Sequence, residues 1–119
     1  MARILLAEDD ESMRRFLAMA LSRAGHDVDD VGDGADALAA IAKSDYQLLL
    51  ADVVMPGIDG IELARRAAIM APRLKVMFIT GFAAIAMKHR NKGGRQAQVL
   101  SKPFHLRDLV DQVDQLLQP

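Results

Sequence analysis

The chain has no cysteine and no tryptophan, and aromatic residues make up 4% of its 119 residues. Without cysteine it forms neither disulfides nor thiolate metal sites, a composition that fits a reducing compartment, so we expect a cytoplasmic protein. So few aromatics offer little surface for stacking bases, and we expect no nucleic-acid partner. No apolar run reaches the roughly 18 residues that span a bilayer, so we expect no membrane association.

Acidic residues are absent from one long stretch, although the net charge is only −1. Between Leu63 and Arg107 the chain carries ten Lys and Arg and no Asp or Glu. A charge run of this kind fits a solvated face and a surface for an acidic partner equally well. The candidate residues of such a partner surface are Lys88, Arg90, Lys92 and Arg95.

Short apolar segments alternate with segments of helical periodicity along the chain. The apolar segments are too short for helices and predict strands, whereas apolar residues spaced by three and four predict helices between them. The second strand is predicted instead from an alternating pattern that places Val28 and Val31 inside. Ser12 is the expected N-cap of the first helix. The fourth helix is expected to be short or mobile, because two glycines follow it. The strands are expected at 3–7, 26–31, 47–51, 74–79 and 97–101, the fourth helix at 83–92 and the fifth at 106–117.

Five strands that alternate with five helices predict an α/β fold in three layers, with a parallel sheet covered on both faces. The length allows one domain. We expect the flavodoxin-like strand order 2-1-3-4-5, in which the carboxyl ends of strands 1, 3, 4 and 5 lie side by side. Open parallel sheets bind their ligands at this edge, between strands 1 and 3.

Polar residues follow four of these strands: Glu8 and Asp9 the first, Asp52 the third, Thr80 the fourth and Lys102 the fifth. Three crowded carboxylates repel one another and need a cation, and oxygen ligands without Cys or His favour Mg²⁺ or Mn²⁺. Such an ion also binds phosphate oxygens, so we expect phosphoryl transfer with Asp52 as the nucleophile. Thr80 and Lys102 would donate to the phosphoryl oxygens.

Each of these residues alone has an ordinary explanation. An Asp that ends a strand is usually a solvated loop residue, a Thr there is often a helix cap, and a lone Lys is usually solvated. Only their combination on four strand ends indicates a site.

Two other functions use similar residues. A Mg²⁺-dependent phosphatase with an Asp nucleophile has a second Asp two residues later as general acid, but here Val53 and Val54 follow Asp52. No group is therefore placed to protonate a leaving group. A flavin-binding module needs a Ser, Thr or Gly loop for phosphate after the first strand, where this chain has four acids at 8–11.

Four segments together resemble the receiver domains of bacterial two-component response regulators. The resemblance covers the whole chain and implies a CheY-like fold, with one receiver domain over residues 1–119 and no output domain. It implies that Asp52 accepts a phosphoryl group from a histidine kinase or a histidine phosphotransfer protein. The protein would then be a phosphoacceptor signalling protein and not an enzyme. The segments are ILLAEDD at 4–10, LLLADVVMPGIDG at 48–60, FITG at 78–81 and LSKPF at 100–104.

The resemblance also implies a set of metal ligands. Asp9 and Asp52 would bind Mg²⁺ directly, together with the backbone carbonyl of Val54, and Glu8 would bind it through water. The choice of Asp9 over Asp10 depends on aligning the start of the helix that follows.

The switch residues implied by the resemblance are Thr80 and Lys102, and the Lys102-Pro103 peptide bond is similar to one that is cis in the family. Receivers usually place Tyr or Phe where this chain has Val99, and that ring follows the Thr when the domain is phosphorylated. Val99 cannot make this movement. We therefore expect a different readout, with an order change in the segment that ends at Gly94.

Among single-domain receivers, the chain is similar to the alphaproteobacterial cell-cycle regulators that act with the ClpXP protease. In these proteins the unphosphorylated form promotes degradation and phosphorylation stops it. We therefore expect a protease adaptor in cell-cycle control whose downstream protein partner is ClpXP. A chemotaxis-type receiver that docks at a motor is the alternative within the same family.

Overall fold

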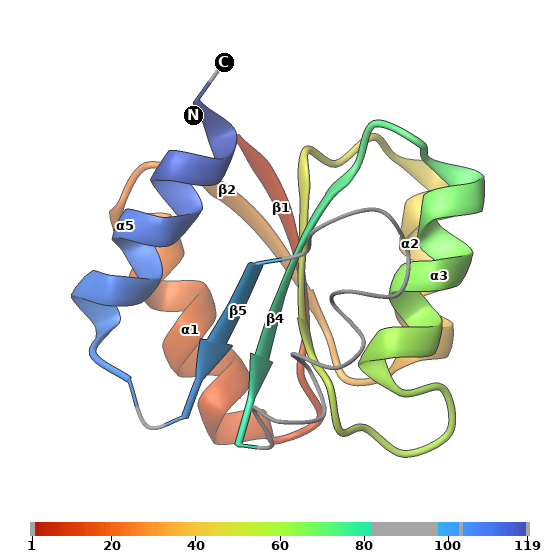
Figure 1. Cartoon of the computed structure of the whole chain (residues 1–119), viewed down its shortest axis with the longest axis horizontal. Coiled ribbons are helices and arrows are strands. Elements are labelled where there is room, and N and C mark those ends of the chain that lie inside the picture. The colour runs from red at the N-terminus through yellow and green to blue at the C-terminus, as the bar shows by residue number, and fades with distance from the viewer. Residues whose placement is uncertain (1, 82–97, 103, 119) are drawn as a thin grey trace.

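The computed structural model describes residues 2–81, 98–102 and 104–118. Within these ranges five parallel strands form one sheet in the order β2-β1-β3-β4-β5, which confirms the predicted flavodoxin-like order (Figure 1). The strands are β1 (Arg3–Ala7), β2 (Asp27–Val31), β3 (Leu48–Asp52), β4 (Lys75–Thr80) and β5 (Gln98–Ser101). The helices of the described residues are α1 (Glu11–Arg23), α2 (Gly34–Lys43), α3 (Gly60–Met70) and α5 (Leu106–Leu117).

Two predictions fall outside the described residues. One is the helix expected at 83–92, together with the basic candidates for a partner surface. The other is the Lys102-Pro103 peptide bond. The residues of the expected surface are Lys88, Arg90, Lys92 and Arg95.

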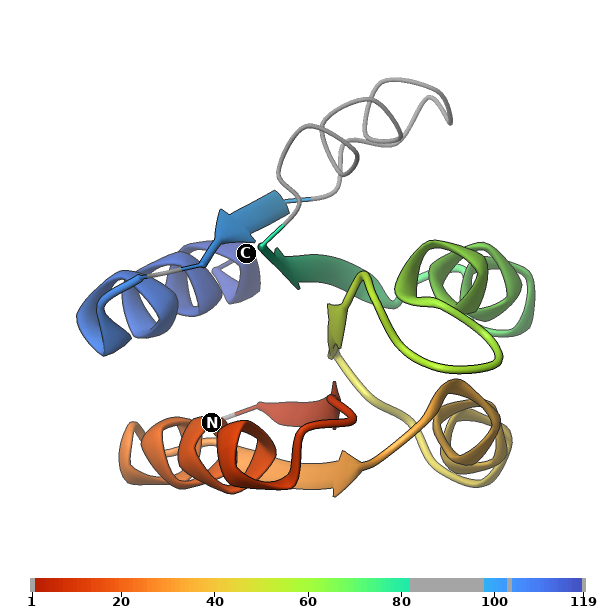
Figure 2. The ribbon, with the colours of Figure 1, turned by 90° about the horizontal axis from the view of Figure 1, so that it is seen from below.

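The sheet separates two apolar cores, because side chains of successive strand residues point to opposite faces. Figure 2 shows α1 and α5 on one face of the sheet and α2 and α3 on the other. All five residues of β3 are buried, since helices cover both faces of this central strand. The core on the α2–α3 face includes Leu5, Leu49, Phe78, Ile41 and Leu63. The core on the α1–α5 face includes Leu6, Leu50, Ile79, Leu17 and Leu109.

Helix α1 begins one residue before the predicted cap. Asp10, not Ser12, occupies the N-cap position, and its carbonyl accepts the first helical hydrogen bond from Arg14 N at 2.8 Å. The prediction of Ser12 was wrong because Asp and Ser are equally good N-caps and the sequence offers both. Glu11 then lies in the first turn, where a negative charge is favourable.

Helix α3 begins directly against the end of β3. The amide of Gly60 donates to the carbonyl of Val53 at 2.9 Å, and a Cβ on Gly60 would lie 2.2 Å from the carbonyl oxygen of Asp52. No side chain fits at that distance. Glycine at position 60 is therefore needed to place the helix and the carboxyl end of β3 together.

We expect Gly60→Ala to lower the free energy of unfolding by about 2–3 kcal/mol or more, since the added methyl group must displace backbone. Urea denaturation measures this change. The matched control is Gly81→Ala, because a Cβ at Gly81 meets no atom of the described residues within 4 Å. The control should stay within about 0.5 kcal/mol of wild type. Equal effects of the two substitutions would contradict the packing argument.

Candidate functional site

Three carboxylates meet at the carboxyl end of the central strands. One oxygen from each of Glu8, Asp9 and Asp52 lies within 4.8 Å of the others. Their proximity follows from the parallel register of β1 and β3, which pairs Ala7 with Ala51. Glu8 and Asp52 are 1% and 7% exposed, whereas Asp9 is exposed. The cluster is thus partly buried and open to solvent on the Asp9 side.

Lys102 brings one positive charge to this cluster. Its Nζ lies 3.2 Å from Glu8 Oε1 and 3.1 Å from Asp52 Oδ2. Its backbone amide donates to the carbonyl of Thr80 at 2.8 Å, which fixes the start of the side chain at the end of the sheet. Thr80 itself is fully buried and follows Ile79, the residue that pairs with Asp52. All five predicted site residues therefore lie at the ends of adjacent strands.

Both oxygens of the Asp52 carboxylate have a defined partner. Oδ1 accepts from the amide of Val54 at 3.1 Å, and Oδ2 accepts from Lys102. The amide of Val53 is held by the carbonyl of Ile79 at 3.1 Å, so the turn after β3 is fixed as well. These contacts orient the carboxylate before any ligand binds. The role of the Val54 carbonyl as a metal ligand stays a prediction.

The buried Glu8 and the partly buried Lys102 have shifted pKa values. The pKa of Glu8 is raised to about 7, chiefly by burial and in addition by the nearby Asp52, against the lowering effects of the Asp10 amide and Lys102. Burial lowers the pKa of Lys102, but its hydrogen bonds and attraction to Asp52 and Glu8 outweigh this effect, so the net shift is upward. The positive charge of Lys102 therefore does not fully offset the effects of burial and of Asp52 on Glu8.

The donor set fits a hard divalent cation. All three side chains offer carboxylate oxygens, the ligands that Mg²⁺ and Mn²⁺ prefer, and none offers sulfur or nitrogen. A cation would also offset the repulsion that raises the pKa of Glu8. Asp9 and Asp52 would hold the ion, with Glu8 close to it.

Val99 lies in β5 and pairs with Phe78 of β4. It is partly buried and packs against the core on the α2–α3 face. Thr80 is two residues beyond Phe78 and so lies on the same face of the sheet. Val99 thus lies on the same face as the expected switch threonine, whose own partner in β5 is Ser101, and the effect of Val99 on the readout stays a prediction.

One residue near the site was missed in the sequence. Arg14 of α1 donates from Nη1 to the carbonyl of Glu8 at 3.0 Å. One sequence feature could have indicated this contact: Arg14 lies near the start of a helix that follows an acidic loop. From that position a long side chain can reach back over the helix start.

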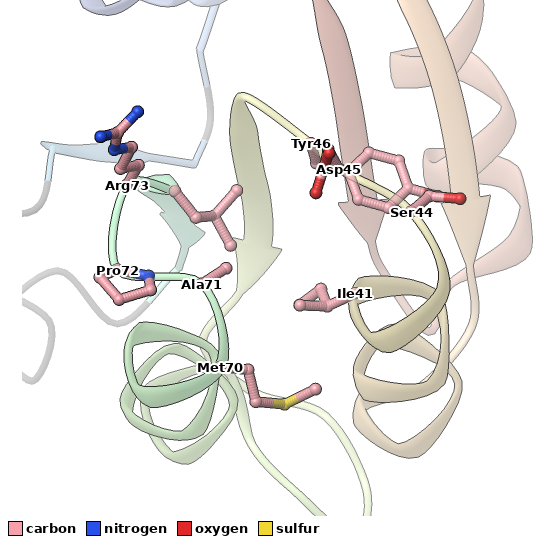
Figure 3. Close-up of a pocket in the computed structure, with 9 residues that line it drawn as sticks. Ile41, Ser44, Asp45, Tyr46, Met70, Ala71, Pro72 and Arg73 are labelled. Atoms are coloured by element: carbon pink, nitrogen blue, oxygen red, sulfur yellow. The ribbon is translucent and has the colours of Figure 1, made fainter.

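A cavity of about 540 Å³ lies at the opposite, amino end of the sheet. Figure 3 shows Ile41 of α2 and Met70 of α3 pointing toward each other across it. None of the predicted site residues lines this cavity.

The chain matches the response regulator receiver domain family over residues 4–114 and belongs to that family. It is 56% identical over 117 residues to the response regulator receiver protein CpdR of Brucella abortus, and the alignment covers 98% of each chain. It is 38% identical over 107 residues to the transcriptional regulatory protein TcrA of Mycobacterium tuberculosis. That alignment covers 90% of this chain but 42% of TcrA.

A solved structure with the same fold is the response regulator protein TrrA from Thermotoga maritima in complex with Mg²⁺-BeF. It superposes with a TM-score of 0.87 at 27% identity and covers 98% of this chain and 100% of that chain.

Family membership supports a phosphoacceptor role and implies a histidine kinase or phosphotransfer partner. Receiver domains generally bind Mg²⁺ at an acidic pocket, and this chain has an acidic group at the corresponding edge of the sheet. Among the described helices, none is long and apolar enough to cross a membrane.

In the absence of divalent cations, Glu8→Gln should change how stability depends on pH. The folded protein holds the Glu8 proton more tightly than the unfolded chain, because the pKa of Glu8 is raised to about 7. This stabilisation is complete below the unfolded pKa of about 4.3 and is lost as the pH rises through the folded value. In EDTA, the free energy of unfolding of wild type should therefore fall more steeply from about pH 5 to 8 than that of Glu8→Gln.

Glu62→Gln is the matched control for this measurement. Hydrogen bonds from Arg65 and Arg66 lower the pKa of Glu62 to about 2, so this group stays charged over the whole range. Its removal should leave the slope unchanged. Parallel curves for wild type and Glu8→Gln would show that Glu8 does not titrate as described.

Proposed function

We propose that this protein is a response regulator whose Asp52 is phosphorylated in a Mg²⁺-dependent reaction. The observation that carries the proposal is the geometry of Asp52. Asp52 as a residue is 7% exposed, and its carboxylate lies beside an acid pair that fits a divalent cation and 3.1 Å from the Lys102 ammonium. Phosphoryl transfer needs a nucleophile, a site for a divalent cation and a positively charged side chain that binds the phosphoryl group. All three lie at one edge of this sheet.

The reaction is an in-line displacement at phosphorus. An oxygen of Asp52 forms a bond to the phosphorus of a phosphohistidine donor, and the bond to the imidazole nitrogen breaks with its electron pair. The product is an acyl phosphate on Asp52 and a free histidine on the donor. Bound Mg²⁺ supplies positive charge to the phosphoryl oxygens. Lys102 supplies a second positive charge to the same group.

The site favours one modification over steady turnover of outside esters. Hydrolysis of an external phosphate ester needs a general acid near the leaving group. Val53 is buried and Val54 is apolar, so the residues after Asp52 offer no proton. The protein then catalyses at most its own phosphorylation and dephosphorylation.

Phosphorylation would redistribute the contacts of Lys102. The phosphoryl group adds about −1.5 to −2 charges at neutral pH. Lys102 now bridges Glu8 and Asp52 and would turn toward the new oxygens, while Thr80 moves to donate its hydroxyl. Val99 has no ring to follow that movement, so the signal passes by another route.

We infer a CpdR-type role for the output, in which the chain acts on ClpXP proteolysis in cell-cycle control. The support is the 56% identity to CpdR over 98% of both chains. In this role the unphosphorylated form binds its partner and phosphorylation releases it.

Asp52→Asn should abolish phosphorylation. With acetyl phosphate and Mg²⁺, wild type should gain the mass of one phosphoryl group per chain, and EDTA should prevent the gain. Asp45→Asn is the matched control, because Asp45 is an exposed aspartate at the other end of the sheet. Intact-protein mass spectrometry detects the product. Undiminished labelling of Asp52→Asn would place the phosphoryl group elsewhere.

Binding to purified ClpX should depend on the state of Asp52. Without beryllofluoride, immobilised wild type should retain ClpX, and Mg²⁺ with beryllofluoride should reduce the retained amount several-fold. Asp52→Asn should retain ClpX under both conditions, since its amide does not bind the phosphate mimic. The CpdR-type role fails if ClpX retention is absent in both states, even where Asp52 is phosphorylated normally.

A further inference from the structure

Arg14 connects the acidic loop after β1 to the neighbouring strand β2. Its Nη1 donates to the carbonyl of Glu8 at 3.0 Å, and its Nε lies 3.0 Å from Asp30 Oδ2. Its own backbone amide donates to the carbonyl of Asp10 at 2.8 Å. One residue therefore holds the loop that carries Glu8 and Asp9 from two sides.

Strand β2 makes a further backbone hydrogen bond to the same loop. The amide of Glu8 donates to the carbonyl of Val31 at 3.1 Å. Both peptide groups of Glu8 are thus anchored to β2, one directly and one through Arg14 and Asp30. These contacts fix the backbone from which the two acids project.

Gly32, just beyond β2, makes room for this arginine. A Cβ at Gly32 would lie 3.0 Å from Arg14 Nη1 and 3.8 Å from its Cζ. The guanidinium therefore passes directly over a residue without a side chain. Arg14 is also only 21% exposed, so its position is set by its surroundings.

We propose that Arg14 is a positioning residue for the divalent cation site, and this inference rests on the proposed function. Three carboxylates within 4.8 Å repel one another and favour an opened loop unless the backbone is restrained. Arg14 supplies that restraint through its two hydrogen bonds and leaves the carboxylates themselves to the cation. Lysine cannot replace it, because one ammonium on a flexible chain does not span both acceptors.

The test measures metal affinity directly, by the loss of the free Mn²⁺ signal in electron paramagnetic resonance. Arg14→Met and Arg14→Lys should each weaken Mn²⁺ binding about tenfold or more, as for other residues that orient metal ligands. Asp30→Asn should weaken it less, because the contact with Glu8 remains. Gly32→Ala should also weaken it several-fold, since it moves the guanidinium and keeps its charge.

Arg15→Met and Arg15→Lys are the matched controls. Arg15 is the next residue of the same helix, is 75% exposed and pairs with Glu11 instead of the acidic loop. These variants should bind Mn²⁺ within twofold of wild type. Urea denaturation in EDTA checks that each variant is folded at the temperature of the metal titration.

The outcomes separate the inference from the proposed function. Wild-type affinity in Arg14→Met overturns the role of Arg14, and wild-type affinity in Arg14→Lys shows that charge alone acts and overturns positioning. Wild-type protein that binds no Mn²⁺, or binds it equally after Asp9→Asn and Asp52→Asn, overturns the cation site itself. Weak binding by Arg14→Lys and Gly32→Ala with normal binding by the Arg15 variants supports the proposal.

Discussion

Electrostatic repulsion among three carboxylates is the constraint on which the functional end of this protein depends. Two unit charges 4.8 Å apart repel by roughly 3 kcal/mol at an effective dielectric constant of about 20, and Glu8, Asp9 and Asp52 lie within that distance. The fold does not remove this repulsion energy. It holds the groups in place with Lys102 and with backbone contacts, so that a cation can offset the repulsion on binding.

The scaffold and the site occupy different parts of the same sheet. Two apolar cores hold the strands in register, and the register brings the strand ends that carry the acids side by side. Changes within the cores would therefore act on the site only through register or through the turn at Gly60. The polar residues at the carboxyl edge carry the chemistry, and the opposite edge carries a cavity that shares none of them.

Much of this arrangement could be predicted from the sequence. The strands that flank the site could be found because β1, β3 and β4 are short apolar runs, and parallel pairing then places Asp52 near the acid pair. The contacts of Arg14 could not be found, because they depend on how α1 lies against Gly32. The raised pKa of Glu8 also depends on burial that no sequence pattern reports. Ser12 was mistaken for a cap because Asp10 is chemically equivalent in that role.

The backbone hydrogen bond between Lys102 and Thr80 has a mechanical consequence. Its 2.8 Å length ties together the ends of β4 and β5, and the chain between these strands leaves from Gly81 and returns at Gln98. Gly81 and Gln98, the described residues on either side of positions 82–97, therefore both adjoin one hydrogen-bonded pair of strands. If Thr80 moves toward a phosphoryl group, as proposed, that movement acts directly on the backbone at Gly81. The effect of phosphorylation at Asp52 would then reach the end of β4 through the backbone, without passing through either core.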